Sequence, residues 1–392
     1  MQKALLLLFL ILFSYTAVIA QANTEVYVFD YKPGYGLSNP VNISNNPGAY
    51  DNQPSFIDDE TLLFSSTRNG QTDIREINIK TKQEKWLTET EGSEYSPLKM
   101  PGKDAISSIR LDKNGLQLLY VYNTQSGTSY PIRDTLKIGY HTWFDSTTLV
   151  SFVLGDESSL VVSDLILNKN ITYQKKIGRS LHKIPGKPLI SYVSKENASW
   201  ELRSLNPATG EMNLIIKMPD GAEDMCWTPA GVALVSKGSQ IYEFNPATNR
   251  SWNYGQNLAE FGLRGISRLA INPSGNKIAV VVTEQPADKV VQMQLDAYNK
   301  RDIYNFLDTF DDRAELYEFP NKLISRGKYA LRKRYEDMFN STPDLHSKIK
   351  SRIVQGNIVI DHEEITKNGK IVYIIAIYEV FNGKIVKATF IK

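Results

Sequence analysis

The sequence predicts a multidomain protein, in which an all-β propeller precedes a smaller α+β domain with a curved sheet. Three observations support this prediction. Residues 23–283 repeat a pattern of short strands and turns about every 40 residues, a period typical of propeller blades. Residues 288–392 read instead as two helices, a strand, a third helix and four strands. The chain of 392 residues is also too long for one ordinary domain.

Residues 1–22 have the features of a secretory signal peptide. Lys3 precedes an apolar run that ends at Phe13, and cleavage is expected after the small residues Ala20 or Ala22. This run is shorter than the ~20 residues that span a bilayer, which disfavours the alternative of a retained membrane anchor. No later segment is long and apolar enough to span, so we expect an exported protein, periplasmic or extracellular, without a stable membrane span after cleavage.

The composition argues against nucleic acid as a partner. The formal net charge is +2, so the chain lacks the strong basic field that nucleic-acid binding requires. Lys348, Lys350 and Arg352 alternate with apolar residues, as on the solvated face of a strand. Cys226 is the single cysteine, so no intrachain disulfide can form, and its apolar neighbours predict a buried and unreactive thiol. No metal and no cofactor are expected.

The first repeat unit contains four short strands separated by turn residues. Its strands lie near residues 50–60, 62–66, 73–78 and 86–88. This unit resembles the TolB-type, WD-like propeller repeat, which implies a propeller fold for residues 23–283. Peptidases often carry such a propeller before an α/β-hydrolase domain. The chain contains no Gly-x-Ser-x-Gly motif and no α/β domain follows, so a serine peptidase is excluded.

Both ends of the repeat region are expected to share one blade. Four complete units follow the first, and they open at Ser96, His141, Leu181 and Cys226. A sixth unit has inner strands near 269–271 and 277–282, and the N-terminal strands near 25–30 and 40–44 can complete it. Such closure removes exposed strand edges. We therefore expect six blades, with seven as the alternative. Two irregular β-sandwiches would explain neither the repeat period nor the complementary ends.

The start of each innermost strand faces the channel of a propeller. Alignment of the turns that follow these strands places one residue of each unit on a common ring. The ring residues are Gln53, Ser96, Tyr140, Ser180, Asp224 and Arg268. All are polar, so the ring is a candidate ligand or peptide site, and a solvated channel without a ligand is the alternative. The ring contains one acid and no histidine, which disfavours a metal site.

The C-terminal segment alternates helical and strand patterns. Residues 284–287 are expected to form the linker, and Asp288 to cap a helix with Val291, Leu295 and Tyr298 on one stripe. A second helix carries apolar residues from 303 to 310. A strand follows at 313–319, then a helix with an apolar stripe over 331–339. Four strands are expected at 346–355, 357–366, 370–381 and 384–391, the last three joined by Asn-Gly turns.

This segment resembles the SnoaL-like branch of the nuclear-transport-factor-two superfamily. The resemblance rests on residues 297–302, 306–310, 314–317, 356–363 and 382–385. It implies a cone-shaped domain over residues 288–392, with a curved sheet wrapped around helices and one pocket. Domains of this family often pair through the open face of the sheet. The resemblance therefore implies a possible homodimer through strands near 373–390.

The resemblance also indicates which residues of this sequence occupy the family's catalytic positions. Ketosteroid isomerases of this superfamily use a carboxylate base, a tyrosine and a protonated aspartate. These positions fall at Glu318, Gln294 and near Ile377, so one of the three groups is retained. Enolate chemistry needs both proton transfer and oxyanion stabilisation. Glu318 by itself can supply the proton transfer but not the oxyanion stabilisation. His362 is the other candidate. Strand alternation places it on the same face as Ile360, where it is expected either to line the pocket or to have a structural role.

The pocket of this domain is the second candidate site. Its expected ligand-binding residues are Gln294, Tyr298, Phe310, Glu318, Tyr335, Phe339, His362 and Ile377. The missing catalytic groups favour an exported binding protein that is not an enzyme. The propeller would then be a recognition surface for a protein partner or ligand, and the second domain a pocket for a small hydrophobic molecule or a dimerisation module. The alternative is an isomerase, lyase or cyclase acting on a hydrophobic carbonyl compound, with Glu318 as base and His362 assisting. A cell-envelope scaffold is a third possibility.

Overall fold

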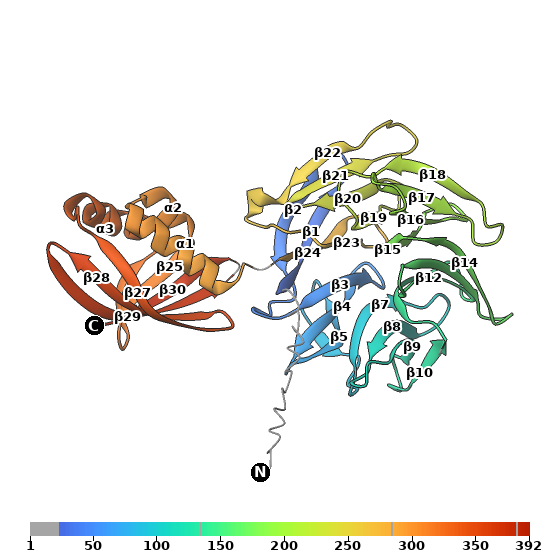
Figure 1. The fold of residues 1–392 in the computed structure, drawn as a ribbon, viewed down its shortest axis with the longest axis horizontal. Coiled ribbons are helices and arrows are strands. Elements are labelled where there is room, and N and C mark those ends of the chain that lie inside the picture. Colours follow the sequence, from blue (N-terminus) through green and yellow to red (C-terminus); the bar gives the residue numbers. More distant parts are fainter. Residues whose placement is uncertain (1–22, 134, 284, 382) are drawn as a thin grey trace, which may run out of the picture.

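The computed structural model describes residues 23–133, 135–283, 285–381 and 383–392. It contains a β-rich region, residues 24–283, and an α+β region, residues 287–391 (Figure 1). The expected signal peptide lies outside the described residues, as does Glu284 of the expected linker. Within the described ranges, none of the helices is long and apolar enough to cross a membrane.

Six four-stranded antiparallel sheets make up residues 24–283 in the described part of the chain. The first along the chain contains β3 (Asp51–Phe56), β4 (Thr61–Arg68), β5 (Gln71–Asn78) and β6 (Glu84–Trp86). The second contains β7 (Ser93–Lys99), β8 (Ala105–Leu111), β9 (Gln117–Asn123) and β10 (Ser129–Arg133). The third contains β11 (Ile138–Trp143), β12 (Thr148–Val153), β13 (Ser159–Asp164) and β14 (Lys169–Lys175).

The next two sheets repeat the same meander. The fourth contains β15 (Ile177–Lys183), β16 (Ile190–Ser194), β17 (Glu201–Leu205) and β18 (Met212–Lys217). The fifth contains β19 (Met225–Trp227), β20 (Ala233–Lys237), β21 (Gln240–Phe244) and β22 (Asn253–Asn257), followed by the 3₁₀ helix η1 (Leu258–Phe261). The innermost strands β3, β7, β11, β15 and β19 contact one another around a centre. The sheets are therefore the blades of a propeller (Figure 1).

The sixth sheet joins the two ends of this region, as expected from the sequence. Its strands are β1 (Thr24–Lys32), β2 (Gly36–Asn42), β23 (Arg268–Ile271) and β24 (Lys277–Thr283), in the order β2-β1-β24-β23. β1 pairs antiparallel with β24, so that Tyr27 lies opposite Val280 (Figure 1). The N-terminal strand thereby covers an edge that would otherwise be open.

Apolar side chains fill the spaces between neighbouring sheets. Between the sixth and first sheets, Val26 and Val281 pack with Leu62 and Phe64, and all four side chains are buried. Turn chemistry separates the strands. Asn206 and Asn245 begin the two Asn-Pro-Ala-Thr turns, and each side-chain oxygen accepts a hydrogen bond from the backbone N–H two residues later.

The α+β region wraps a six-stranded sheet around three helices. The helices are α1 (Ala287–Lys300), α2 (Ile303–Asp308) and α3 (Lys328–Ser341). The strands, in sheet order, are β26 (Lys322–Arg326), β25 (Phe310–Glu318), β30 (Lys384–Ile391), β29 (Lys370–Phe381), β28 (Ile358–Lys367) and β27 (His346–Gln355). β25 and β30 pair in parallel, and the other neighbours are antiparallel. Figure 1 shows the helices on one side of the sheet.

Three details of this region differ from the expectation. Helix α1 begins at Ala287 with Pro286 as its N-cap, so Asp288 lies in the first turn and does not cap the helix. The second helix ends at Asp308, because Phe310 already belongs to β25. β26 was not expected at all. It is a short edge strand with mostly exposed or half-buried side chains, so it lacks a clear apolar alternation.

Aromatic packing and one buried ion pair hold the helices on the sheet. Phe306 of α2 packs against Tyr335 and Phe339 of α3, with ring centroids 4.4 and 5.5 Å apart. Arg352 of β27 donates two hydrogen bonds to the buried carboxylate of Asp361 in β28, at 2.6 and 2.7 Å. Its Nη1 also donates to Gln292 of α1 at 3.1 Å. This network ties α1 to the inner face of the sheet.

Candidate functional site

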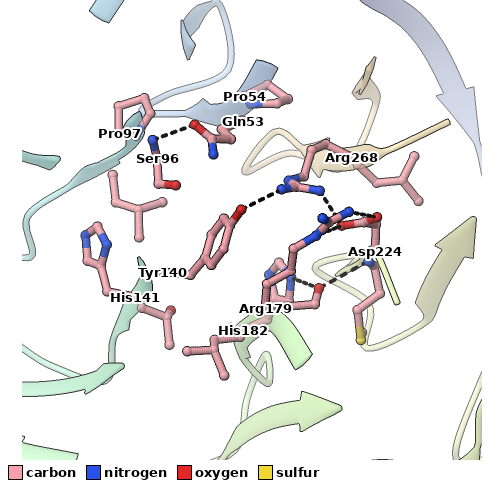
Figure 2. Close-up of a pocket in the computed structure, with 16 residues that line it drawn as sticks. Gln53, Pro54, Ser96, Pro97, Tyr140, His141, Arg179, His182, Asp224 and Arg268 are labelled. Atoms are coloured by element: carbon pink, nitrogen blue, oxygen red, sulfur yellow. Dashed lines mark hydrogen bonds and ion pairs between the residues drawn. The ribbon is translucent and has the colours of Figure 1, made fainter. Parts of the chain in front are cut away.

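A pocket of about 140 Å³ opens at the mouth of the propeller channel. All six ring residues expected from the sequence line it: Gln53, Ser96, Tyr140, Ser180, Asp224 and Arg268. They lie on, or directly before, the innermost strand of each of the six sheets. The structure adds Arg179, His141 and His182 to the lining (Figure 2).

Irregular strand pairing turns side chains towards this mouth. The register of the innermost strand shifts between Asn52 and Ser55 in β3, and between Tyr95 and Leu98 in β7. Equivalent shifts occur in β11 and β15. An irregularity of this kind bends a strand and re-aims its side chains. Gln53 and Ser96 lie within these shifts at φ values of 56° and 53°, a backbone conformation that non-glycine residues adopt rarely.

Asp224 holds two arginines at the centre of the pocket wall. Its carboxylate accepts hydrogen bonds from Arg179 Nε at 3.1 Å and from Arg179 Nη2 at 2.7 Å. Arg268 Nη1 donates to the same carboxylate at 2.7 Å, and Arg268 Nη2 donates to the Tyr140 hydroxyl at 3.1 Å (Figure 2). Residues from four blades thus form one network, and the two guanidinium groups are held beside each other.

The two histidines of the pocket are neutral at physiological pH. Burial lowers the pKa of His141 to about 3 and the pKa of His182 to about 4. For Arg179, burial acts to lower the pKa, but the hydrogen bonds and charge of Asp224 outweigh it and raise the pKa. The charged groups among the described lining residues are therefore Arg179, Arg268 and Asp224.

A second ion pair fixes the backbone beside the pocket. The Glu223 carboxylate accepts a hydrogen bond from the Arg179 backbone N–H, and Lys195 Nζ donates to it at 2.9 Å. Burial acts to raise the pKa of Glu223, but these two contacts lower it, so the group remains ionised. Glu223 and Lys195 neutralise each other, so they leave the charge of the pocket unchanged.

Ser180 and His182 form a hydroxyl–imidazole pair that resembles a nucleophile with its base. Ser180 Oγ lies 3.0 Å from His182 Nε2 and accepts a hydrogen bond from the Met225 N–H at 3.2 Å. A general base works best with a pKa near the operating pH. Since the pKa of His182 falls to about 4, this pair is a weak candidate for nucleophilic catalysis. Its hydrogen bonds instead link β15 to β19.

The α+β domain contains a second cavity of about 270 Å³, between the helices and the sheet. Four residues expected there line it: Gln294, Tyr298, Glu318 and Tyr335. Glu318 pairs with Lys392, with 3.3 Å between its Oε2 and the lysine Nζ, and its side chain is about one-third exposed. Glu318 is therefore a rim carboxylate that already has a cationic partner.

The other four residues expected in the cavity do not line it. Phe310 and Phe339 are buried in the aromatic core, so they do not line the cavity. Ile377 alternates with the inward-facing Ala376 and Tyr378, which turns it away from the helices. His362 is exposed and lies on the outer face of the sheet, with Ile353 and Tyr373. It cannot assist a reaction in this cavity.

The buried carboxyl group of the cavity is Glu363, which is not among the residues expected from the sequence. Ser347 Oγ donates to Glu363 Oε2 at 2.8 Å, and the Tyr378 hydroxyl donates to Oε1 at 3.0 Å. Burial raises the pKa of Glu363, although both hydrogen bonds act in the opposite direction. A signal was present: if His362 lies with Ile360 on one face of β28, then Asp361 and Glu363 share the other face.

Arg179 is not predicted by the repeat pattern. The pattern places one residue of each unit on the ring, and in the fourth unit that residue is Ser180. The role of Arg179 depends on Asp224, which lies 45 residues later in the chain. No local pattern connects the two.

Elsewhere, burial raises the pKa of Cys226 to about 12, in keeping with an unreactive thiol. The described residues contain no cluster of three or more potential metal ligands among His, Cys, Asp and Glu.

Comparison with known proteins supports both parts of this architecture. Residues 291–388 match the family model of the SnoaL-like domain. A TolB-like structure from Agrobacterium tumefaciens is similar to 68% of this chain and 99% of its own, with 12% identity and a TM-score of 0.53. The chain therefore combines a TolB-like propeller with a C-terminal SnoaL-like domain.

Other solved structures match about a quarter of the chain. A ketosteroid isomerase-type protein from Kribbella flavida covers 27% of this chain and 76% of its own, with 15% identity and a TM-score of 0.25. An LEH-like epoxide hydrolase from M. tuberculosis covers 27% and 80%, with 17% identity and a TM-score of 0.24. Similarity at this level carries no information on function. A comparison with curated proteins gave no match.

Proposed function

We propose that this chain is an exported binding protein whose propeller recognises its ligand at the mouth of the channel. The observation that carries the proposal is the pocket to which all six innermost strands contribute a polar residue. Its hydrogen-bonding groups are fixed in advance by the network around Asp224, and such preorganisation lowers the entropic cost of binding. Export is inferred from the features of residues 1–22 and is compatible with a TolB-like fold.

The groups in this pocket suit recognition better than catalysis. Guanidinium, phenol and hydroxyl groups orient a ligand through hydrogen bonds. The histidine beside Ser180 is a weak base, as its lowered pKa indicates. The pocket is also smaller than the roughly 300–1,000 Å³ typical of pockets that bind a drug-sized ligand. It therefore fits the end of a longer ligand, the rest of which would lie outside the mouth.

The proposal is tested by thermal-shift measurements on the purified protein with a panel of short peptides, sugars and small organic acids. We expect at least one class to raise the melting temperature, because a ligand that binds the folded state stabilises it. Arg268→Gln should abolish that shift, and Arg250→Gln, which changes an exposed arginine in the β21–β22 turn, should retain it. A shift that survives in Arg268→Gln would place the ligand elsewhere and contradict the proposal.

A second candidate function is proton-transfer catalysis in the cavity of the SnoaL-like domain. The observation that favours it is Glu363, a buried carboxyl group with a raised pKa in a cavity that also contains Tyr298, Tyr335 and Tyr378. In its carboxylate form such a group can accept a proton from the carbon next to the carbonyl group of a β,γ-unsaturated ketone and return it to the γ-carbon. The reaction class would be isomerisation of a hydrophobic ketone.

This candidate is tested with a β,γ-unsaturated ketone, whose conversion to the conjugated isomer is followed by ultraviolet absorbance. If the cavity is catalytic, Glu363→Gln should lower the rate by at least about a hundredfold, in the range typical of a lost general base. Glu318→Gln is the matched control, since the rim carboxylate is paired with Lys392. No turnover by the wild-type protein, or equal rates in both variants, would remove this candidate.

A further inference from the structure

The geometry of the channel pocket points to a ligand that carries a carboxylate group, bound jointly by Arg179 and Arg268. This inference rests on the proposed function, because it names the chemistry that the same pocket recognises.

The pocket carries more positive than negative charge. Asp224 is the one carboxylate among the described lining residues, and it faces two guanidinium groups. Both histidines of the lining are neutral, and the neighbouring Lys195 is paired with Glu223. The side chains of Arg179 and Arg268 are 35% and 16% exposed, so the excess charge is partly desolvated. A partly desolvated charge gains more from an opposite charge than one in bulk water.

Both arginines keep donors for a ligand. A guanidinium group has five N–H donors. Arg179 directs its Nε–H and one Nη2–H to Asp224. Arg268 directs Nη1 to Asp224 and the Ser267 carbonyl, and Nη2 to the Tyr140 hydroxyl. In these contacts neither group uses all of its donors. The planar arrangement of guanidinium donors matches the two oxygens of a carboxylate.

A hydroxyl group on the opposite wall provides a further donor. Ser96 lines the pocket, and its Oγ is buried and has no hydrogen-bond partner among the described residues. A buried polar atom without a partner is costly, unless a ligand or water fills the position. The backbone around it is held in place, since the Ser96 N–H donates to Gln53 Oε1 at 2.9 Å (Figure 2).

Size and charge favour a carboxylate over a phosphate. The space of about 140 Å³ accommodates a small terminal group. A phosphate monoester carries close to two negative charges at neutral pH, whereas the pocket offers an excess of one positive charge. A carboxylate satisfies this excess. The shared chemistry could come from the C-terminus of a peptide or from an acidic sugar, and these two sources are separated by experiment.

Isothermal titration of the purified protein with matched acid and amide pairs tests the inference. The first pair is a short alanine peptide with a free C-terminus and the same peptide as its C-terminal amide. The second pair is glucuronate and glucuronamide. We expect one of the two acids to bind, its amide to bind at least about tenfold more weakly, and the affinity to fall with added salt, as expected for a charge-assisted contact.

Single replacements of the arginines connect this preference to the pocket. Arg179→Gln and Arg268→Gln should each weaken binding of the acid by about tenfold to a hundredfold. Either variant should fold, because the other arginine still pairs with Asp224. Arg179→Lys keeps the charge but loses the two-pronged geometry, so it should bind between wild type and Arg179→Gln. Arg250→Gln should bind like the wild type.

The outcomes separate the two proposals. Equal binding of acid and amide, both weakened by Arg268→Gln, would overturn the carboxylate inference and leave the channel as the binding site. Acid binding that neither arginine variant weakens would overturn the inference and place the site elsewhere. If neither acid binds but a neutral compound of the thermal-shift panel requires Arg268, the carboxylate inference fails and the proposed function stands. If nothing binds in either assay, both fail.

Discussion

Asp51 and Glu94 occupy equivalent places in neighbouring blades, each two residues before a ring residue. Asp51 is fully buried. Burial raises its pKa to about 7, although contacts with Ser66 and Asn46 act in the opposite direction. Glu94 is also fully buried, and burial raises its pKa although Thr90 and Tyr122 donate hydrogen bonds to it. These carboxyl groups stand directly behind the channel mouth and should retain protons that exposed carboxyl groups lose.

Asp51 should make the free energy of unfolding fall as the pH rises. In the unfolded chain Asp51 loses its proton near pH 4, whereas in the folded protein it keeps it until about pH 7. Between these values the folded state binds more protons, so stability present below pH 4 is lost as the pH rises through 7. Asp51→Asn should remove this dependence, with a gain on the order of a few kcal/mol above pH 7 and little change below pH 4.

Urea unfolding at about pH 4, 6 and 8 measures this effect as a change in the free energy of unfolding. Asp104→Asn is the matched control, because Asp104 is exposed and lies in the β7–β8 turn of the neighbouring blade. An Asp51→Asn profile with the same slope as the wild-type profile would show that the carboxyl group is not protonated in the folded state.

At the scale of elements, the pairing of β1 with β24 closes the propeller. Phe29 of β1 is fully buried, packs edge-on against Phe261 with ring centroids 5.5 Å apart, and belongs to a cluster with Leu258 and Ile278. The N-terminal strand therefore contributes apolar contacts as well as backbone hydrogen bonds. A closure of this kind should couple the stability of all blades to one strand.

Phe29→Ala should lower the free energy of unfolding of the propeller by about 3–5 kcal/mol, the usual cost of a cavity left by a buried phenylalanine. Tyr35 lies in the β1–β2 turn and its side chain is 80% exposed. Tyr35→Ala should therefore lower the free energy of unfolding by less than about 1 kcal/mol. Denaturant unfolding followed by tryptophan fluorescence gives both values. Equal effects of the two variants would show that the buried contacts of β1 do not stabilise the propeller.

At the scale of the whole molecule, the outer face of the SnoaL-like sheet is a candidate homodimer interface. Ile353, Tyr373 and Ile375 are exposed there by 63%, 54% and 39%, and His362 lies among them. Contiguous exposed apolar side chains are uncommon on monomers and often mark an interface. The sequence-based expectation of a homodimer through this sheet stays a prediction, and this face is where it should occur.

Sedimentation analysis of the purified protein should give the mass of a dimer, and Ile353→Glu should shift it to the mass of a monomer, because a buried unpaired charge is costly. Ile166→Glu is the control, since Ile166 is equally apolar and exposed but lies in the propeller. A monomeric wild-type protein, or a dimer that persists in Ile353→Glu, would contradict this expectation.

Much of the fold could be predicted because the signals are local and repeated. The phase of the propeller repeat places one residue of each unit at the same point, so Gln53, Tyr140 and Arg268 could be grouped although they are far apart in sequence. Alternation in β28 separates His362 from Glu363, but it does not say which face the helices cover. The packing of the helices on one face of the sheet decides that Glu363, and not His362, enters the cavity.

The sequence by itself determined the two domains, the sharing of one blade between the ends of the propeller, and the polar ring of the channel. Each depends on periodicity or on complementary strands, which are properties of the chain. The tertiary structure alone decided that Asp224 joins Arg179 to Arg268, and that Glu363 is buried while Glu318 stays at the rim. The charge and pKa of these groups depend on neighbours distant in sequence and on burial, and folding creates both.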